Sequence, residues 1–139
     1  MRIDDKIDEI DRYLEELISI TPKDFRKYSS DIKTKAACER YFEKIVESIT
    51  DLAFLIIKDK GLRSPEDDKQ AFDILAEEKE ISKALGDRLK AAKGMRNILA
   101  HQYGQVDDEI VFEAITREII TDAKEFISGI EKDDTDRNP

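Results

Sequence analysis

The stretch CERYFEKIVESITDLAFLIIK, residues 38–58, decides the fold class of this chain. Its apolar residues recur every three or four positions, which is the spacing of one face of an α-helix. They form two neighbouring lines along that face, the first through Tyr41, Ile45, Ile49, Leu52 and Ile56 and the second through Phe42, Val46, Ala53 and Ile57. A face this broad predicts the most buried helix of the protein, from about Asp31 to Lys58 and ended by Gly61.

Helical spacing also appears at both ends of the chain. An apolar stripe begins at Ile3 and stops at Thr21-Pro22, because the residue before a proline is pushed out of the helical region. Residues 23–30, KDFRKYSS, are expected to form a loop or a short turn. Near the other end, Asp107 is a candidate N-cap for a stripe that continues to about residue 130.

The segment between these helices predicts one helix or two. Ser64 suits an N-cap and Pro65 suits the first helical position, so we expect the helical region to begin there. Apolar spacing then continues through Leu99. Gly86 and Gly94 allow a break or kink, which leaves open whether residues 66–80 and 82–103 are separate helices.

The fold expected from these segments is all-α. Four or five amphipathic helices with short links make an antiparallel bundle, and no alternating pattern is long enough to suggest a sheet. The length of 139 residues fits one domain, which we place at residues 1–131. Residues 132–139 are expected to form a disordered acidic tail, because EKDDTDRNP contains no apolar residue.

Composition excludes several classes of protein. A single cysteine, Cys38, rules out an internal disulfide and a cysteine metal cluster, and a reducing cytoplasm is the expected setting. The longest apolar run, residues 52–57, is too short to span a bilayer, and the acidic start lacks a signal core. No phosphate loop, nucleophile elbow or paired metal ligands are present, so we expect no membrane, metal or cofactor.

Charge is distributed unevenly along the chain. The net charge of −9 argues against a general nucleic-acid coat protein, because phosphates would be repelled. Residues 83–96, KALGDRLKAAKGMR, nevertheless carry five basic residues against one acid. Such a run is usually a solvated helix face. Because this one leads directly into the motif described next, we predict that Arg88, Lys90 and Lys93 form a small RNA-binding strip.

The motif is RNILAHQYG, residues 96–104, which gathers Arg96, Asn97, Tyr103 and the only histidine, His101. Asn97 and His101 are four residues apart and share one line of a helix. Arg96 and His101 are five apart, about 140° around the axis, so an isolated helix does not place them side by side. A symmetric dimer offers one solution, because two copies of this helix would bring both sets of side chains into one cleft.

These side chains suit cleavage of RNA. The reaction needs a base for the 2′-hydroxyl proton, an acid for the leaving oxygen and a cation for the developing phosphorane charge. Histidine can serve as acid or base near neutrality, and arginine supplies permanent charge in a geometry that fits phosphate. One histidine cannot fill both proton-transfer roles at once, whereas two chains supply two.

The motif at residues 96–104 resembles the signature of a known family. Arg96, His101 and Tyr103 match the Rx4HxY form of the HEPN signature, and Asn97 fits the polar position after the arginine. The chain is similar to HepT-like toxins, the partners of minimal nucleotidyltransferases of the MntA type. The similarity extends over roughly residues 1–130 and includes the stretches 38–58, 61–82 and 89–111.

The resemblance implies a bundle that forms a homodimer, a metal-independent endoribonuclease site in the dimer cleft and a toxin role. It implies that Arg96 and His101 are catalytic and that Asn97 supports them. It also implies that the cognate nucleotidyltransferase antitoxin attaches AMP to Tyr103 and so silences the nuclease.

Two other functions stay open from the sequence. The first is a non-catalytic HEPN subunit that binds nucleotide or substrate for a nucleotidyltransferase, and the second is a plain helical dimerisation module. Three of the motif residues also have a structural explanation. His101 could cap a helix end, Arg96 could pair with an acid, and Tyr103 could be a half-buried ring at an interface.

Overall fold

The computed structural model describes residues 2–101 and 106–137, with side chains described as far as residue 132. The described chain is helical and contains no strand, which confirms the all-α prediction. In this part of the chain no helix is long and apolar enough to cross a bilayer. The elements in order are α1 (Ile3–Ile20), α2 (Phe25–Ser30), α3 (Ile32–Asp59), α4 (Asp68–Glu77), α5 (Lys83–His101), α6 (Asp108–Glu113), the π-helical segment η1 (Ala114–Glu118) and α7 (Ile119–Arg137).

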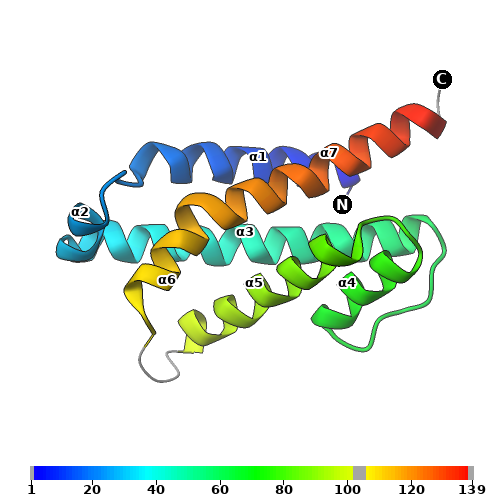
Figure 1. Ribbon diagram of the computed structural model, residues 1–139. Helices are drawn as coiled ribbons and strands as arrows, with labels where there is room; N and C mark the ends of the chain where they lie inside the picture. The colour runs from blue at the N-terminus through cyan, green and yellow to red at the C-terminus, as the bar shows by residue number, and fades with distance from the viewer. Residues whose placement is uncertain (1, 102–105, 138–139) are drawn as a thin grey trace.

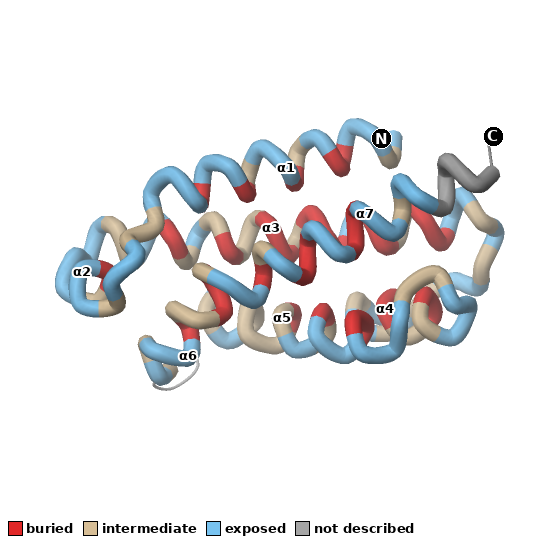
Figure 2. The backbone as a smooth tube through the Cα atoms, turned by 45° about the horizontal axis from the view of Figure 1, so that its top comes forward, coloured by how far each residue is buried: buried red, intermediate tan, exposed pale blue. Residues whose placement is uncertain are grey.

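Helix α3 forms the centre of the bundle. It has more buried residues than any other described helix and contacts α1, α2, α4, α5 and η1. Figure 1 shows α1, α3, α5 and α7 running in alternating directions, with α1 and α5 on opposite sides of α3. In Figure 2 the buried residues, in red, recur along the helices, and α3 carries many of them. The prediction of a most buried helix from about Asp31 to Lys58 is therefore confirmed.

Two expected helix ends are also confirmed. Helix α1 stops at Ile20, with Thr21 as C-cap directly before Pro22. After α3, Gly61 adopts a φ of 65°, which lets the Leu62 amide donate to the Ile57 carbonyl at 2.9 Å. This left-handed turn closes a helix at little cost because glycine lacks a Cβ atom.

The segment predicted as a loop, residues 23–30, instead contains the short helix α2. Asp24 caps it by accepting from the Arg26 amide at 2.7 Å. Tyr28 is fully buried, with its ring centre 4.9 Å from that of Phe112 and 6.4 Å from that of Phe25. The prediction was wrong because Phe25 and Tyr28 alone do not make a recognisable helical pattern. The helix is stabilised by packing against Phe112, which is distant in the sequence.

The start of the third helical region was also predicted wrongly. Helix α4 begins at Asp68 rather than at Pro65, and its N-cap is Asp67, whose carboxylate accepts from the Gln70 amide at 2.8 Å. A carboxylate at this position satisfies an amide that the helix leaves unpaired. Ser64 and Pro65 lie in the connection between α3 and α4.

The structure settles the open question of one helix or two. Helices α4 and α5 are separate, and the break lies between residues 77 and 83 rather than at a glycine. Lys79 adopts a left-handed φ of 59° in this turn. Gly86 lies inside α5 and is buried, and a Cβ atom there would be 3.5 Å from the Phe72 carbonyl and from Ala76. These are ordinary van der Waals distances, so Gly86 lies at the contact between α4 and α5 and does not mark the break between them.

The last helical region begins where expected, with Asp107 accepting from the Glu109 amide at 2.9 Å. It continues through η1 into α7 as far as Arg137. The backbone of residues 132–137 is thus helical in the segment for which we predicted a disordered tail. No glycine or proline follows Gly129 before Pro139, and extending an existing helix costs far less than starting one.

Candidate functional site

Three of the motif residues, Arg96, Asn97 and His101, lie in the last two turns of α5. Arg96 is half-buried, and its Nη1 donates to the Asn97 side-chain oxygen at 3.3 Å. Its Nη2 donates to the Glu47 carboxylate of α3 and forms an ion pair with it. The Arg96 Nε is buried and has no partner among the described residues. The guanidinium is thus held toward α3 with one donor still unsatisfied.

His101 is in a different position from Arg96. It is the last residue of α5 and is exposed, one helical turn beyond the half-buried Asn97. Asn97 and His101 therefore share a line of α5 as predicted, whereas Arg96 is directed to the central helix. Tyr103 lies outside the described residues, so its predicted modification stays a prediction.

A hollow of about 470 Å³ lies beside Arg96 and Asn97, where the beginning of α4 meets α5. Its lining is strongly charged and consists of Asp67, Asp68, Lys69, Lys93, Arg96 and Asn97. Lys93 is only 8% exposed, and its Nζ lies 2.8 Å from the Asp68 carboxylate. The fold thus adds charged groups from α4 to the motif on α5.

The basic run of residues 83–96 is neutralised by ion pairs in the folded chain. Arg88 binds Asp122 and Glu125 of α7, each at 2.9 Å. Lys90 binds Asp73 of α4 at 2.7 Å, and this carboxylate raises the pKa of Lys90 above its ordinary value. With the Lys93 and Arg96 pairs, these contacts connect α5 to α3, α4 and α7. The RNA-binding roles expected for Arg88, Lys90 and Lys93 stay predictions. The contacts of these side chains show that they attach α5 to α4 and α7.

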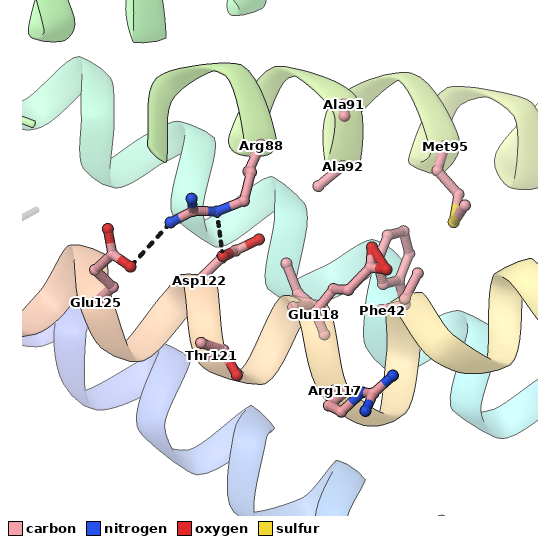
Figure 3. A pocket seen from close by; sticks show the side chains of 12 residues that line it. Phe42, Arg88, Ala91, Ala92, Met95, Arg117, Glu118, Thr121, Asp122 and Glu125 are labelled. Carbon is pink, nitrogen blue, oxygen red and sulfur yellow. Dashed lines mark hydrogen bonds and ion pairs between the residues drawn. The ribbon is translucent and has the colours of Figure 1, made fainter. Parts of the chain in front are cut away.

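A second hollow, of about 510 Å³, lies on another side of α5, between this helix and η1 with α7. Figure 3 shows Ala91, Ala92 and Met95 along its α5 side, with the Arg88 ion pairs closing one end. Its lining contains neither Arg96 nor His101. Among the described residues, no group of three or more histidine, cysteine, aspartate or glutamate side chains could hold a metal ion.

The sequence profile of the family described as "Ribonuclease HepT-like" matches residues 10–130 of this chain. The chain belongs to the HepT-like ribonuclease family. A candidate RNase of Archaeoglobus fulgidus is 31% identical over 124 residues, which cover 87% of this chain and 92% of that protein. The mRNA nuclease HepT of Shewanella oneidensis is 26% identical over 107 residues, which cover 77% of this chain and 80% of that protein.

Solved structures agree with the sequence match. The tri-AMPylated HEPN toxin of Shewanella oneidensis, in complex with its MNT antitoxin, superimposes with a TM-score of 0.87 at 25% identity. The superposition covers 95% of this HepT-like chain and 99% of the toxin chain. The predicted resemblance to HepT-like toxins is thereby confirmed.

Two residues of the candidate site were not predicted from the sequence. Glu47 lies 49 positions before its partner Arg96, and Lys69 lies outside the basic run. The sequence contains 33 acidic residues, so no local signal marks Glu47 as the one that meets the motif. Only the packing of α3 and α4 against α5 identifies both.

The Lys93–Asp68 pair generates an asymmetric stability prediction. We expect Asp68→Ala to lower the free energy of unfolding by about 1–3 kcal/mol, because the buried Lys93 ammonium loses its partner. Lys93→Met should change it by less than about 1 kcal/mol, since the chain volume is kept and the 45% exposed Asp68 can be hydrated.

Urea unfolding measures both changes, and the double variant provides the control. Asp68→Ala combined with Lys93→Met should recover most of the loss seen in Asp68→Ala alone. Equal losses in the two single variants would contradict a buried, singly partnered lysine.

Proposed function

We propose that this HepT-like chain is the ribonuclease toxin of a toxin–antitoxin pair. The observation that carries the proposal is the arrangement at the end of α5, where His101 is exposed and Arg96 is fixed by Asn97 and by Glu47 from the central helix. The family match over residues 10–130 and the naming of two relatives as RNases support it. RNA is the substrate, the setting is the cytoplasm, and no cofactor is proposed.

The proposed reaction is metal-independent. His101 accepts the proton of the attacking 2′-hydroxyl or donates one to the leaving 5′-oxygen, and Arg96 stabilises the charge on the phosphorane. Asn97 keeps the guanidinium in place through its side-chain oxygen. Both Arg96 terminal nitrogens already have protein partners, so phosphate would approach a cation whose position is fixed beforehand.

A homodimer is proposed to complete the site. The last two turns of α5 support it, because no residue from Gly94 to His101 is fully buried although Met95, Ile98 and Leu99 are apolar. Ala91, Met95 and Ile98 form one line with spacings of four and three, and Ile98 is 40% exposed. A second copy packed along this line would cover it and bring two His101 side chains to one cleft.

Silencing is proposed to occur by AMP attachment to Tyr103 by a cognate minimal nucleotidyltransferase. The support is the similarity to the tri-AMPylated toxin bound to its MNT antitoxin. Two residues separate Tyr103 from His101 in the sequence. An added AMP would bring bulk and negative charge to a site meant for RNA phosphate, so steric exclusion and repulsion would act together.

A second candidate function is a non-catalytic HEPN subunit that binds nucleotide or substrate for a nucleotidyltransferase. One observation favours it, namely that Glu47 already neutralises Arg96 in the chain by itself. If that ion pair is only structural, the motif would not cut RNA.

Substitution of the motif tests the proposed nuclease. We expect His101→Ala and Arg96→Ala each to lower the rate of RNA cleavage by at least about 10²-fold and to remove growth toxicity, as loss of a general acid–base or charge-stabilising group does. The matched control is Arg63→Ala, which removes an exposed arginine paired with Glu77 at 2.8 Å. Circular dichroism would verify folding. Full cleavage by both motif variants would remove Arg96 and His101 as catalytic residues, whereas a wild type that binds RNA without cutting it would favour the non-catalytic subunit.

The dimer has its own test. Ile98→Asp should shift the protein from dimer to monomer in sedimentation equilibrium and abolish cleavage, because it places a charge in the proposed apolar contact. Ile32→Asp is the matched control, since Ile32 is 82% exposed and belongs to the start of α3 rather than to the proposed contact line of α5. A dimer that survives Ile98→Asp would remove α5 as the pairing surface.

The modification is tested by mass. Incubation with the cognate nucleotidyltransferase and ATP should add AMP to the wild type but not to Tyr103→Phe, which should stay toxic in the presence of the partner. Tyr13→Phe, a change at a half-buried tyrosine of α1, serves as the control and should still be modified. AMP attachment to Tyr103→Phe together with neutralisation would show that the assignment is wrong.

A further inference from the structure

We infer that the hollow beside Arg96 holds a second backbone phosphate of the RNA and that Lys69 of α4 is the side chain that binds it. The inference rests on the proposed ribonuclease function and names a substrate-positioning residue outside the sequence motif.

Lys69 lies directly against the motif helix. Its Nζ is 3.5 Å from the point where a Cβ atom on Gly94 would be, so the ammonium lies over the backbone of α5. Gly94, Asn97 and His101 are spaced by three and four residues and therefore share one face of that helix. The ammonium thus lies on the face that carries His101, about two turns before it.

The other charged groups in the hollow already have partners. Lys93 is paired with Asp68 at 2.8 Å, and Asp67 accepts from the Gln70 amide as the N-cap of α4. Arg96 is paired with Glu47. Within residues 2–101 and 106–132, Lys69 is exposed and has no carboxylate partner. It is therefore the cation in the hollow that can bind an anion without first losing an ion pair.

Distance determines which phosphate Lys69 can bind. Gly94 and His101 are seven residues apart, on the order of 10 Å along the helix axis. Hydrogen bonds of about 3 Å cannot join groups that far apart to the same phosphate. Lys69 would therefore bind a phosphate next to the cleaved linkage, and it would affect how RNA is held rather than how the bond is broken.

The inference also changes where RNA is expected to lie. Arg88 and Lys90 are occupied by carboxylates of α7 and α4, so an RNA strand along them would have to displace ion pairs. A strand running from His101 past Asn97 to Lys69 meets an unpaired ammonium instead. This path crosses from α5 to the start of α4.

The test measures binding in a His101→Ala background, in which RNA is held but not cut. A short single-stranded RNA is the probe. We expect Lys69→Ala to weaken binding several-fold at low salt and to reduce the slope of log affinity against log salt by about 0.7, the value for one phosphate contact on a single strand. Lys69→Glu should weaken binding on the order of tenfold. Lys58→Glu, a charge reversal at an exposed lysine near the end of α3, should leave both quantities unchanged.

A second probe identifies the phosphate. In this RNA a neutral methylphosphonate replaces the phosphate beside the cleavable linkage. The His101→Ala protein should bind it more weakly than it binds the unmodified RNA. The protein that also carries Lys69→Ala should bind both RNAs with the same affinity. In the catalytically intact protein, Lys69→Ala should raise KM more than it lowers kcat.

The outcomes separate this inference from the proposed function. Suppose that the wild type cuts RNA, but that Lys69→Glu in the His101→Ala background leaves the affinity and the salt slope unchanged. The phosphate site is then overturned, and the proposed nuclease function stands. If the wild type neither cuts nor binds RNA, both are overturned. A loss equal to that of Lys58→Glu would show a general charge effect and would also overturn the site.

Discussion

Burial of α3 on several sides is the constraint on which the rest of the structure depends. Each fully buried aliphatic side chain contributes about 1.5–3 kcal/mol relative to exposure, and α3 carries such residues along most of its length. Helices α1, α4 and α5 are held against it for that reason. None of the charged residues of α3 is fully buried, and the partly buried Glu47 is the one that pairs with Arg96. The position of the motif guanidinium is therefore a consequence of how the central helix is packed.

Ion pairs between helices determine what the basic residues of α5 can do. Their carboxylate partners come from α3, α4 and α7, so the positive run of the sequence becomes a set of attachments inside the fold. Breaking a partly buried pair costs more than a surface pair contributes, because the remaining charge keeps its desolvation penalty. A lysine without such a partner, Lys69, is for this reason a better candidate for substrate contact than its more numerous paired neighbours.

Helical periodicity predicted much of the fold, and its failures have physical causes. The helices around Ile10, Ile49 and Phe126 are long enough for their apolar spacing to be unambiguous. Helix α2 was missed because it is short and its Tyr28 is stabilised by Phe112, more than eighty positions away. The sequence allowed separate helices at residues 66–80 and 82–103, which correspond to α4 and α5, but the turn between them contains Lys79 in a left-handed conformation, and Gly86 and Gly94 both lie inside α5.

By itself the sequence determined the all-α class, the central role of residues 38–58 and the one constellation of Arg96, Asn97 and His101 on a helix. These follow from spacing along the chain, because a helix converts sequence intervals directly into faces. Only the tertiary structure decided that Arg96 is directed to Glu47, that Arg88, Lys90 and Lys93 are paired, and that Lys69 stands beside Gly94. Such contacts join residues far apart in the chain, and their partners are chosen by the packing of whole helices rather than by any local pattern.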